Sequence, residues 1–342
     1  MALLDSANKR IAVAATLLVI AIALFVAHNT YQPKAEYHHN NGGIFGTTYH
    51  IIYLAEQDYH EDIKQVMLEV DSSLSVFNPQ STISHINEGS SDVDKHFVTV
   101  FNKSAEIYRL SDGAFDITVS PLVEAWGFGK SDLPHANQQI VDSILLFVGF
   151  NKLHLTDGKL TKDDPRITMN ASAIAKGYGC DVVAHFLESK EINNYIVEIG
   201  GEIVCRGVNE EGELWHIGIT QPTDDVLGSN NKAQEIICGD IINLATSGTY
   251  RQFYYENGIR RSHTIDPRTG CPVSNNLVSA TVISVDCMTA DGLATACMVM
   301  GKDESLELIE SLDNTECYLI CEEDGQYIEA KSSGFDKYLV NE

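Results

Sequence analysis

Segments with helical and with strand-like periodicity follow one another along this chain without the regular strand–helix–strand order of a parallel sheet. Apolar side chains recur at helical spacing in Ile63–Leu74, and a second amphipathic helix is predicted over about 99–110. Asn257–Gly258 separates two short strand-like runs, a pattern typical of a two-residue β-hairpin. Hairpins join antiparallel strands, so the sequence predicts an α+β fold.

Further strands are predicted in the second half of the chain from alternating and β-branched residues. They cover Tyr195–Cys205 with an interruption at Gly200–Gly201, then Leu214–Thr220 and Val278–Val285, and a helix follows at Thr289–Met300. The sequence contains no internal repeat, and its 342 residues are enough for one large domain or two smaller ones.

The formal net charge of −25 at pH 7 excludes two classes of general partner. A chain this acidic repels nucleic acid and anionic lipid surfaces, so neither is expected to bind the domain as a whole. An anionic ligand needs a local positive charge on the protein to offset this repulsion.

The first thirty residues form a separate unit. Lys9 and Arg10 precede an apolar run at 11–27, an arrangement typical of an export signal or a signal anchor. The run is close to the lower limit of about 17 residues for a membrane-spanning helix. The positive-inside rule leaves the two basic residues in the cytoplasm and puts the rest of the chain outside it. The expected organisation is a cytoplasmic segment at 1–10, a transmembrane anchor at 11–27, a polar linker at 28–41 and a folded domain at 42–342.

Eight cysteines lie between Cys180 and Cys321, and none forms a C-x-x-C pair. Because no cysteine precedes Cys180, a lipid anchor near the N-terminus is excluded. Several of the cysteines lie in apolar stretches, and most are therefore predicted to be small core residues.

Two glycine-containing segments could receive a flat or a phosphorylated ligand. Gly113–Asp116, followed by Trp126–Gly129, combines aromatic side chains with flexible backbone. Ser172–Tyr178 places small residues and Lys176 at the start of a helix, where amide N–H groups suit a diphosphate. A packed turn and an ordinary helix start give the same patterns, so both alternatives stay open.

Two further segments offer acid–base and metal-binding groups. Thr246–Arg251 contains small hydroxyl residues, and His263 in the segment His263–Pro267 is the best candidate for a general base near neutral pH. Asp291 and Thr295 lie four residues apart, so a helix presents both oxygens to one ion. A helix-starting Asp and a Thr bonded to its own backbone would explain the same spacing.

Taken together and in order, these segments resemble the ApbE family, the FAD:protein FMN transferases, from about Phe45 to Gly301. The matching segments are Phe45-Gly46-Thr47, Phe77 with Ser81 to Asn87, GAFD with WGFG, SAIAKGY, Glu198-Ile199-Gly200-Gly201, TSGTY, HTIDPRTG and DGLATA. The resemblance implies an α+β, T-fold-like architecture in which FAD lies in a cleft between two subdomains.

The resemblance also implies roles for individual residues. It places in the FAD cleft Phe45, Phe77, Ala114, Phe115, Asp116, Ser172, Lys176, Tyr178 and Ile265. It gives Mg²⁺ three protein ligands, which are the Ala175 carbonyl and the side chains of Asp291 and Thr295. His263 is expected to take a proton from the acceptor hydroxyl, and Asp266 is expected to orient that loop.

The expected reaction is Mg²⁺-dependent transfer of FMN from FAD to a threonine or serine hydroxyl, with release of AMP. The family implies a periplasmic flavoprotein acceptor, a subunit of the Na⁺-translocating NADH:quinone oxidoreductase or of the Rnf complex, and hence a bacterial inner-membrane location. Hydrolysis of FAD to FMN and AMP, or FAD binding without catalysis, are the alternatives.

The chain departs from the family pattern at three points. Asn170 stands where relatives commonly have Asp, Phe45 replaces a frequent Met, and the lipid-anchor motif is missing. None of these departures removes an expected metal ligand, so we expect an active enzyme.

Overall fold

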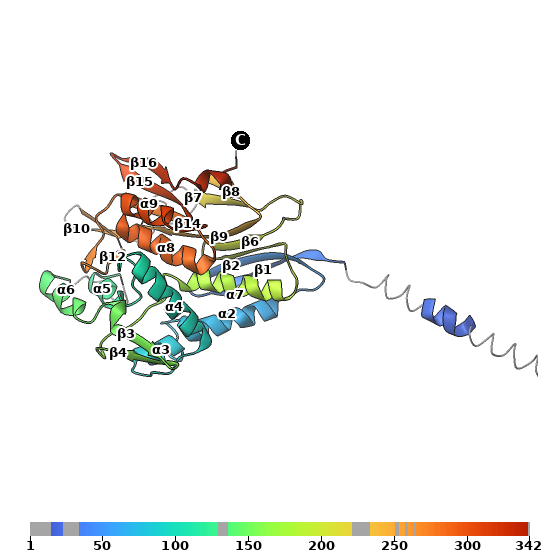
Figure 1. The fold of residues 1–342 in the computed structure, drawn as a ribbon, viewed down its shortest axis with the longest axis horizontal. Coiled ribbons are helices and arrows are strands. Elements are labelled where there is room, and N and C mark those ends of the chain that lie inside the picture. Colours follow the sequence, from blue (N-terminus) through green and yellow to red (C-terminus); the bar gives the residue numbers. More distant parts are fainter. Residues whose placement is uncertain are drawn as a thin grey trace, which may run out of the picture.

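The computed structural model describes residues 15–22, 34–128, 136–220, 233–249, 253–256, 259–262 and 264–340. Within them, an eight-stranded antiparallel sheet with the order β1-β2-β5-β6-β9-β14-β15-β16 forms the centre of the fold (Figure 1). Its strands are β1 (Glu36–Ile44), β2 (Thr47–Ala55), β5 (Tyr195–Ile199), β6 (Glu202–Arg206), β9 (Ile241–Gly248), β14 (Leu277–Ile283), β15 (Glu316–Glu323) and β16 (Gln326–Lys331).

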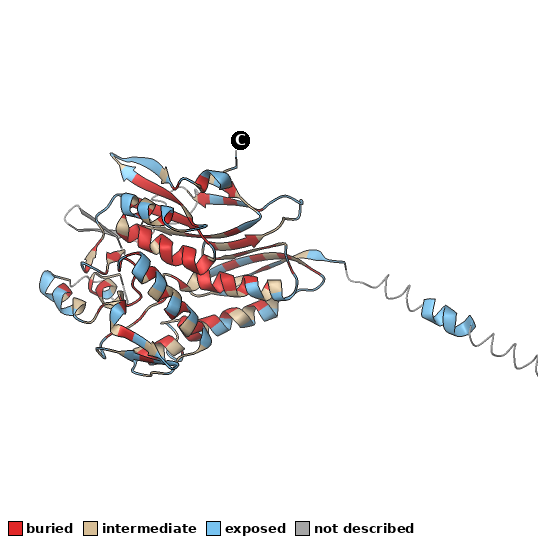
Figure 2. Ribbon diagram, in the orientation of Figure 1, coloured by how far each residue is buried: buried red, intermediate tan, exposed pale blue. Residues whose placement is uncertain are grey.

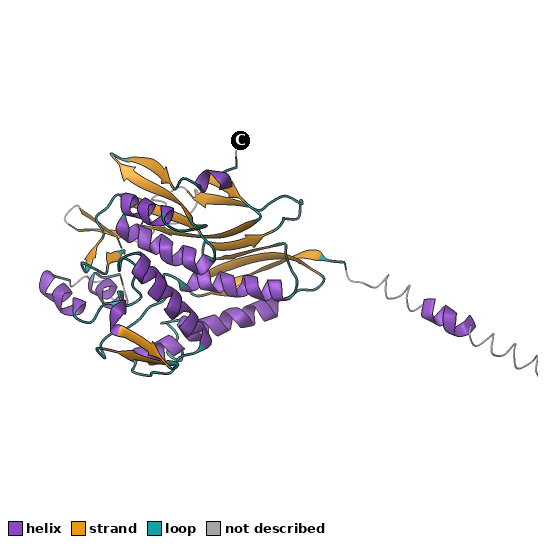
Figure 3. Cartoon of the chain, in the orientation of Figure 1, coloured by secondary structure: helices purple, strands orange, loops and turns teal. Residues whose placement is uncertain are grey.

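Short strand pairs and helices surround this sheet (Figure 3). The pairs are β3 (Leu153–Thr156) with β4 (Lys159–Lys162), β7 (His216–Thr220) with β8 (Ala233–Cys238), β10 (Phe253–Glu256) with β11 (Ile259–Ser262), and β12 (Ile265–Asp266) with β13 (Cys271–Pro272). The helices are α2 (His60–Leu74), α3 (Thr82–Asn87), α4 (Lys95–Leu110), α5 (Ser120–Ala125), α6 (Gln138–Leu145), α7 (Ala175–Ser189), α8 (Cys287–Met300) and α9 (Lys302–Glu310), with short 3₁₀ turns η1 (Phe150–Lys152) and η2 (Phe335–Tyr338).

Helices α7 and α8 cover one face of the sheet, and α2 and α4 pack outside them. On the other face, Ile217 and Ile219 of β7 and the preceding Trp215 join an apolar cluster with sheet residues. Because both faces are covered, β14 is buried at every position and α8 along most of its length (Figure 2). The α+β class predicted from the sequence is confirmed.

Two close contacts join α7 to α8. The Asp181 carboxylate of α7 accepts hydrogen bonds from the amides of Cys287 (2.9 Å) and Met288 (2.8 Å) at the start of α8. A side chain on Gly177 would put its Cβ 2.4 Å from the Cys287 carbonyl oxygen, so only glycine allows this approach. The first turns of the two helices are therefore held against each other.

Most predicted elements are confirmed, with small shifts at their ends. The predicted hairpin is β10–β11, and the glycine interruption separates β5 from β6. Helix α4 starts at Lys95 rather than near 99, because Asp94 caps it by accepting from the Phe97 amide at 2.9 Å. Helix α8 likewise starts two residues before the predicted Thr289, with Asp286 as its cap.

The linker predicted at 28–41 is wrong over its second half, because Glu36–Asn41 belong to strand β1. This edge strand pairs through its backbone with β2 along its whole length, from Glu36 opposite Ala55 to Ile44 opposite Thr47. Polar edge strands carry little apolar signal, since only one edge and part of one face are covered. Residues 28–33 lie outside the described residues.

Most of the predicted membrane anchor at 11–27 also lies outside the described residues. The part of it that is described, residues 15–22, forms an exposed helix. Within the part of the chain that the structure describes, no helix combines the length and the hydropathy needed to cross a membrane.

The cysteines lie mostly in the core, as predicted. Six of them are buried, namely Cys180, Cys205, Cys287, Cys297, Cys317 and Cys321, whereas Cys238 and Cys271 are partly accessible. All eight are free thiols in this structure.

We predict that Asp94→Ala lowers the free energy of unfolding by about 1–3 kcal/mol at pH 7, because it removes the shared acceptor for α2, α3 and α4. The Asp94 carboxylate accepts hydrogen bonds from Ser73 Oγ at 2.8 Å and Thr82 Oγ1 at 2.5 Å, besides the Phe97 amide. Urea unfolding of both proteins measures the difference. Asp313→Ala, at an exposed position, is the matched control and should change stability by less than about 0.5 kcal/mol.

This difference should also depend on pH. Burial alone would raise the pKa of Asp94, but its hydrogen bonds outweigh burial and lower that pKa below the ordinary value. The stabilisation is therefore complete above the unfolded-state pKa of about 4 and is lost as the pH falls through the folded-state pKa. A difference that stays constant or grows between pH 6 and pH 3 would contradict this account.

Candidate functional site

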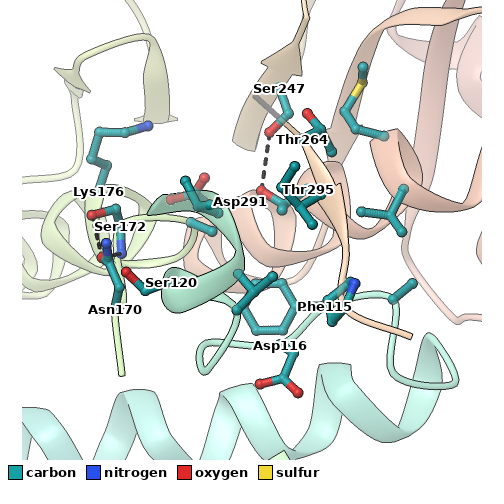
Figure 4. Close-up of a pocket in the computed structure, with 18 of the residues that line it drawn as sticks. Phe115, Asp116, Ser120, Asn170, Ser172, Lys176, Ser247, Thr264, Asp291 and Thr295 are labelled. Atoms are coloured by element: carbon teal, nitrogen blue, oxygen red, sulfur yellow. Dashed lines mark hydrogen bonds between the residues drawn. The ribbon is translucent and has the colours of Figure 1, made fainter. Parts of the chain in front are cut away.

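A cavity of about 460 Å³ opens where the first turn of α7, the end of β9, strand β12 and the inner face of α8 meet (Figure 4). The loop from Ala114 to Asp116 and the start of α5 close its other side. Polar and apolar side chains both line it, and it has the size and composition of a small-molecule site.

Eight of the residues predicted from the sequence lie in the wall of this cavity. They are Ala114, Phe115, Asp116, Ser172, Lys176, Ile265, Asp291 and Thr295. They come from segments that are up to about 180 residues apart in the sequence, and the fold brings them to one place.

Asp291 is a buried acidic group of the site, with only 3% of its surface exposed. Its Oδ2 accepts a hydrogen bond of 2.9 Å from the Gly177 amide in the first turn of α7. Burial raises the pKa of Asp291, and the charge of Lys176 and the Gly177 hydrogen bond act in the opposite direction. A positive charge near the buried Asp291 carboxylate therefore stabilises its ionised form.

Thr295 lies one turn after Asp291 on α8, and both side chains face the cavity (Figure 4). The Thr295 hydroxyl lies 3.3 Å from Ser247 Oγ at the end of β9. Carboxylate and hydroxyl oxygens thus converge on one part of the wall.

These oxygens fit a magnesium ion better than a transition metal. Among the described residues, no three His, Cys, Asp or Glu side chains lie together as a complete metal cage. Mg²⁺ commonly takes one or two carboxylates and completes its octahedron with water and substrate phosphate. Buried Asp291 with neighbouring hydroxyl oxygens is a donor set of that kind.

Lys176 supplies positive charge to the cavity. Its ammonium pairs with Oε1 of Glu202, a side chain that is only 3% exposed. Burial alone would lower the pKa of Lys176, but the negative charges of Asp291 and Glu202 outweigh burial and raise it. The lysine is therefore cationic at physiological pH, and it provides the local charge that an anionic ligand of this acidic protein requires.

The turn between β5 and β6 leaves space for the Lys176–Glu202 ion pair. Gly200 and Gly201 both have positive φ, 67° and 105°, which favours glycine. A Cβ on Gly200 would also lie 3.2 Å from Cδ of Lys176, so the lysine stem passes directly over the glycine. The turn thus explains why two glycines precede Glu202.

Asp116 lies in the wall, but its carboxylate points away from the cavity (Figure 4). It accepts hydrogen bonds from the Thr118 amide and hydroxyl, both at 2.7 Å, and from the Phe150 amide at 2.9 Å. Asp116 therefore fixes the loop that carries Phe115, and its carboxylate does not face the cavity.

Four of the residues assigned to FAD or metal lie outside the wall. Tyr178 packs in the core and bonds through its hydroxyl with His96 Nδ1 at 2.8 Å. Phe77 is 80% exposed between α2 and α3, Phe45 packs against Gly179, and Ala175 is the first residue of α7. Their predicted contacts stay predictions.

The two residues assigned to proton transfer differ in what the structure describes. His263 lies outside the described residues. Asp266 accepts from the Arg268 amide at 2.9 Å and pairs with the Arg268 side chain at 3.0 Å. Its backbone oxygen accepts from the Gly270 amide, and the Trp126 indole donates to the Gly270 carbonyl at 2.8 Å. Asp266 thus holds the turn that follows Ile265.

Sequence reasoning missed part of the wall. Glu202 was not singled out, although two glycines before an acidic residue at a strand start indicate a special turn. Ser120, Val123, Met298 and Val299 also line the cavity, but nothing in their local sequence distinguishes them from ordinary helix residues.

Comparison with known proteins agrees with this geometry. The family model described as "ApbE family" matches residues 45–319. A Vibrio cholerae protein named FAD:protein FMN transferase is 36% identical over 94% of this chain and 98% of its own length. A Haemophilus influenzae protein of the same name is 34% identical over 93% of this chain and 96% of its own length.

Solved structures show the same fold. Flavin transferase ApbE from Vibrio cholerae superposes with a TM-score of 0.80 at 37% identity, covering 89% of this chain and all of that one. The apo form of Pseudomonas stutzeri flavinyl transferase ApbE gives a TM-score of 0.79 at 28% identity, over 90% and 98% of the two chains. The family resemblance seen in the motifs is confirmed, and the chain belongs to the ApbE family.

Proposed function

We propose that this protein transfers FMN from FAD to a threonine or serine hydroxyl of another protein, with Mg²⁺ and release of AMP. The observation that carries the proposal is the convergence of Asp291, Thr295 and Lys176 on one cavity of a chain with this family's fold. The Vibrio cholerae and Haemophilus influenzae relatives, both named FAD:protein FMN transferase, support it.

In this proposal, Asp291, Thr295 and the Ala175 carbonyl hold Mg²⁺, which when bound neutralises charge on the FAD diphosphate. The Lys176 ammonium binds the same diphosphate from the α7 side. Phe115 and Ile265 supply apolar surface to the flavin-containing part of the substrate, and the Ala114–Asp116 backbone fixes its position. Binding and charge neutralisation account for most of the acceleration expected in phosphoryl transfer.

The transfer exchanges one phosphorus–oxygen bond for another. The acceptor hydroxyl oxygen forms a bond to the FMN phosphorus, and the bond from that phosphorus to the bridging oxygen breaks. AMP leaves with the bridging oxygen, and the hydroxyl proton goes to a base, for which His263 is our candidate. The acceptor proposed from the family resemblance is a periplasmic flavoprotein subunit of a respiratory redox complex.

We further propose that residues 11–27 hold the chain in the bacterial inner membrane, with the catalytic domain in the periplasm. Lys9 and Arg10 before the apolar run support this orientation. FAD and the acceptor would then meet the enzyme outside the cytoplasm.

Transfer is tested with the full chain in detergent, FAD, Mg²⁺ and an acceptor domain, by mass spectrometry of the acceptor and assay of AMP. We expect an FMN adduct and AMP in equal amounts, and loss of both on chelation. Asp291→Asn keeps the shape and the Gly177 hydrogen bond but removes the charge, and it should lower the rate at least about 100-fold.

Asp313→Asn, which removes an exposed carboxylate, is the matched control and should transfer at the normal rate. AMP without an adduct on any acceptor would favour FAD hydrolysis. FAD binding without AMP would leave only a flavin carrier, and full activity of Asp291→Asn would overturn the metal assignment.

Membrane attachment is tested by fractionating cells that express the full chain or a chain lacking residues 1–27. The full chain should stay with membranes after carbonate extraction, and protease added to spheroplasts should degrade its domain. Protection from that protease would show that the orientation is reversed.

A further inference from the structure

The cavity wall holds two buried carboxylates, Asp291 and Glu202, and the ammonium of Lys176. The ammonium contacts Glu202, whereas Asp291 accepts its hydrogen bond from the Gly177 amide. Figure 4 shows the Lys176 side chain ending apart from the Asp291 carboxylate.

Asp291 is the other acidic group near this lysine. Its carboxylate accepts from the amide of Gly177, the residue next to Lys176, and Asp291 and Lys176 line the same cavity. Opposite charges at short range in a buried site attract each other strongly because water screens them poorly. Without a competing partner, the flexible four-carbon stem of the lysine would let the ammonium move to Asp291.

Glu202 is placed to be that competing partner. It is the first residue of β6, 2% exposed, and its second oxygen Oε2 is buried without a hydrogen-bond partner. The Gly200 turn lets the lysine stem pass toward it. An isolated buried carboxylate is costly, so the ammonium and Glu202 stabilise each other.

We propose that Glu202 is a positioning residue that holds the Lys176 ammonium away from Asp291, so that the Asp291 carboxylate stays available to a divalent cation. The inference rests on the proposed function for the identity of that cation as Mg²⁺. The unpartnered Oε2 gives Glu202 capacity to keep the ammonium when a cation lies at Asp291. The same arrangement leaves the ammonium on the cavity wall for the substrate diphosphate.

The charges of the site make the role of Glu202 measurable. With both carboxylates ionised, the two carboxylates and the paired ammonium would carry one net negative charge. Glu202→Gln makes the group neutral and leaves Asp291 as the only carboxylate for Lys176. Both changes oppose binding of a cation at Asp291, whereas additional removal of the ammonium by Lys176→Met restores the original net charge.

The test is Mg²⁺ binding to the full chain in detergent, measured by calorimetry without FAD or acceptor. We expect Glu202→Gln to raise the Mg²⁺ Kd at least 10-fold. The double variant Glu202→Gln/Lys176→Met should return to within about threefold of the normal Kd, because no ammonium competes. Glu307→Gln removes one exposed charge outside the cavity and should leave the Kd unchanged. Thermal melting of each protein checks that it is folded.

Three results would overturn the inference. Equal Mg²⁺ binding by the wild-type and Glu202→Gln proteins would overturn the inference but not the proposed function. A folded double variant whose Mg²⁺ Kd stays raised would do the same, because Glu202 would then have a purely structural role. Absence of Mg²⁺ binding by the wild-type chain would overturn it together with the metal part of the proposed function. If Glu202→Gln does not fold, the Lys176→Met variant provides the test. Removal of the ammonium should lower the Mg²⁺ Kd, and an unchanged Kd would contradict the inference.

Discussion

The structure depends on the reciprocal contact between the first turns of α7 and α8. Asp181 of α7 accepts hydrogen bonds from two amides at the start of α8, and Asp291 of α8 accepts one from Gly177 at the start of α7. Helix starts carry unpaired N–H groups and partial positive charge, so each helix supplies the acceptor that the other needs. Glycine at position 177 makes this approach sterically possible.

This contact explains why a buried carboxylate lies in the cavity. Asp291 is held by α7 on one side, and Lys176, Glu202, Thr295 and Ser247 line the same cavity. A protein with 48 acidic and 23 basic residues thereby presents one lysine and the buried Asp291 carboxylate to one small volume. The long-range repulsion of an anionic substrate is offset where the substrate has to bind.

The sequence predicted elements with strong local patterns and missed features that depend on pairing across the fold. The β10–β11 hairpin, helix α2 and the DGLATA helix were predictable from periodicity and turn residues. Strand β1 was not, because its polar residues are held by backbone bonds to β2. Asp291 and Thr295 were predictable as a pair on one helix, but Glu202 becomes significant only where the β5–β6 turn meets α7. Asp116 was assigned to the cleft from its motif, and only the fold shows that its carboxylate bonds to the Thr118 and Phe150 amides.

The central claim is that one cavity between α7, α8 and β9 binds both the divalent cation and the FAD diphosphate. Crystals grown with FAD and Mn²⁺ in place of Mg²⁺ would locate the ion by its anomalous scattering. The account predicts one strong peak in bonding contact with Asp291 and Thr295 and next to the diphosphate. The Lys176 ammonium should contact the diphosphate on the side away from the ion. A peak at a different cluster of carboxylates, or FAD bound with its diphosphate away from Asp291, would contradict it.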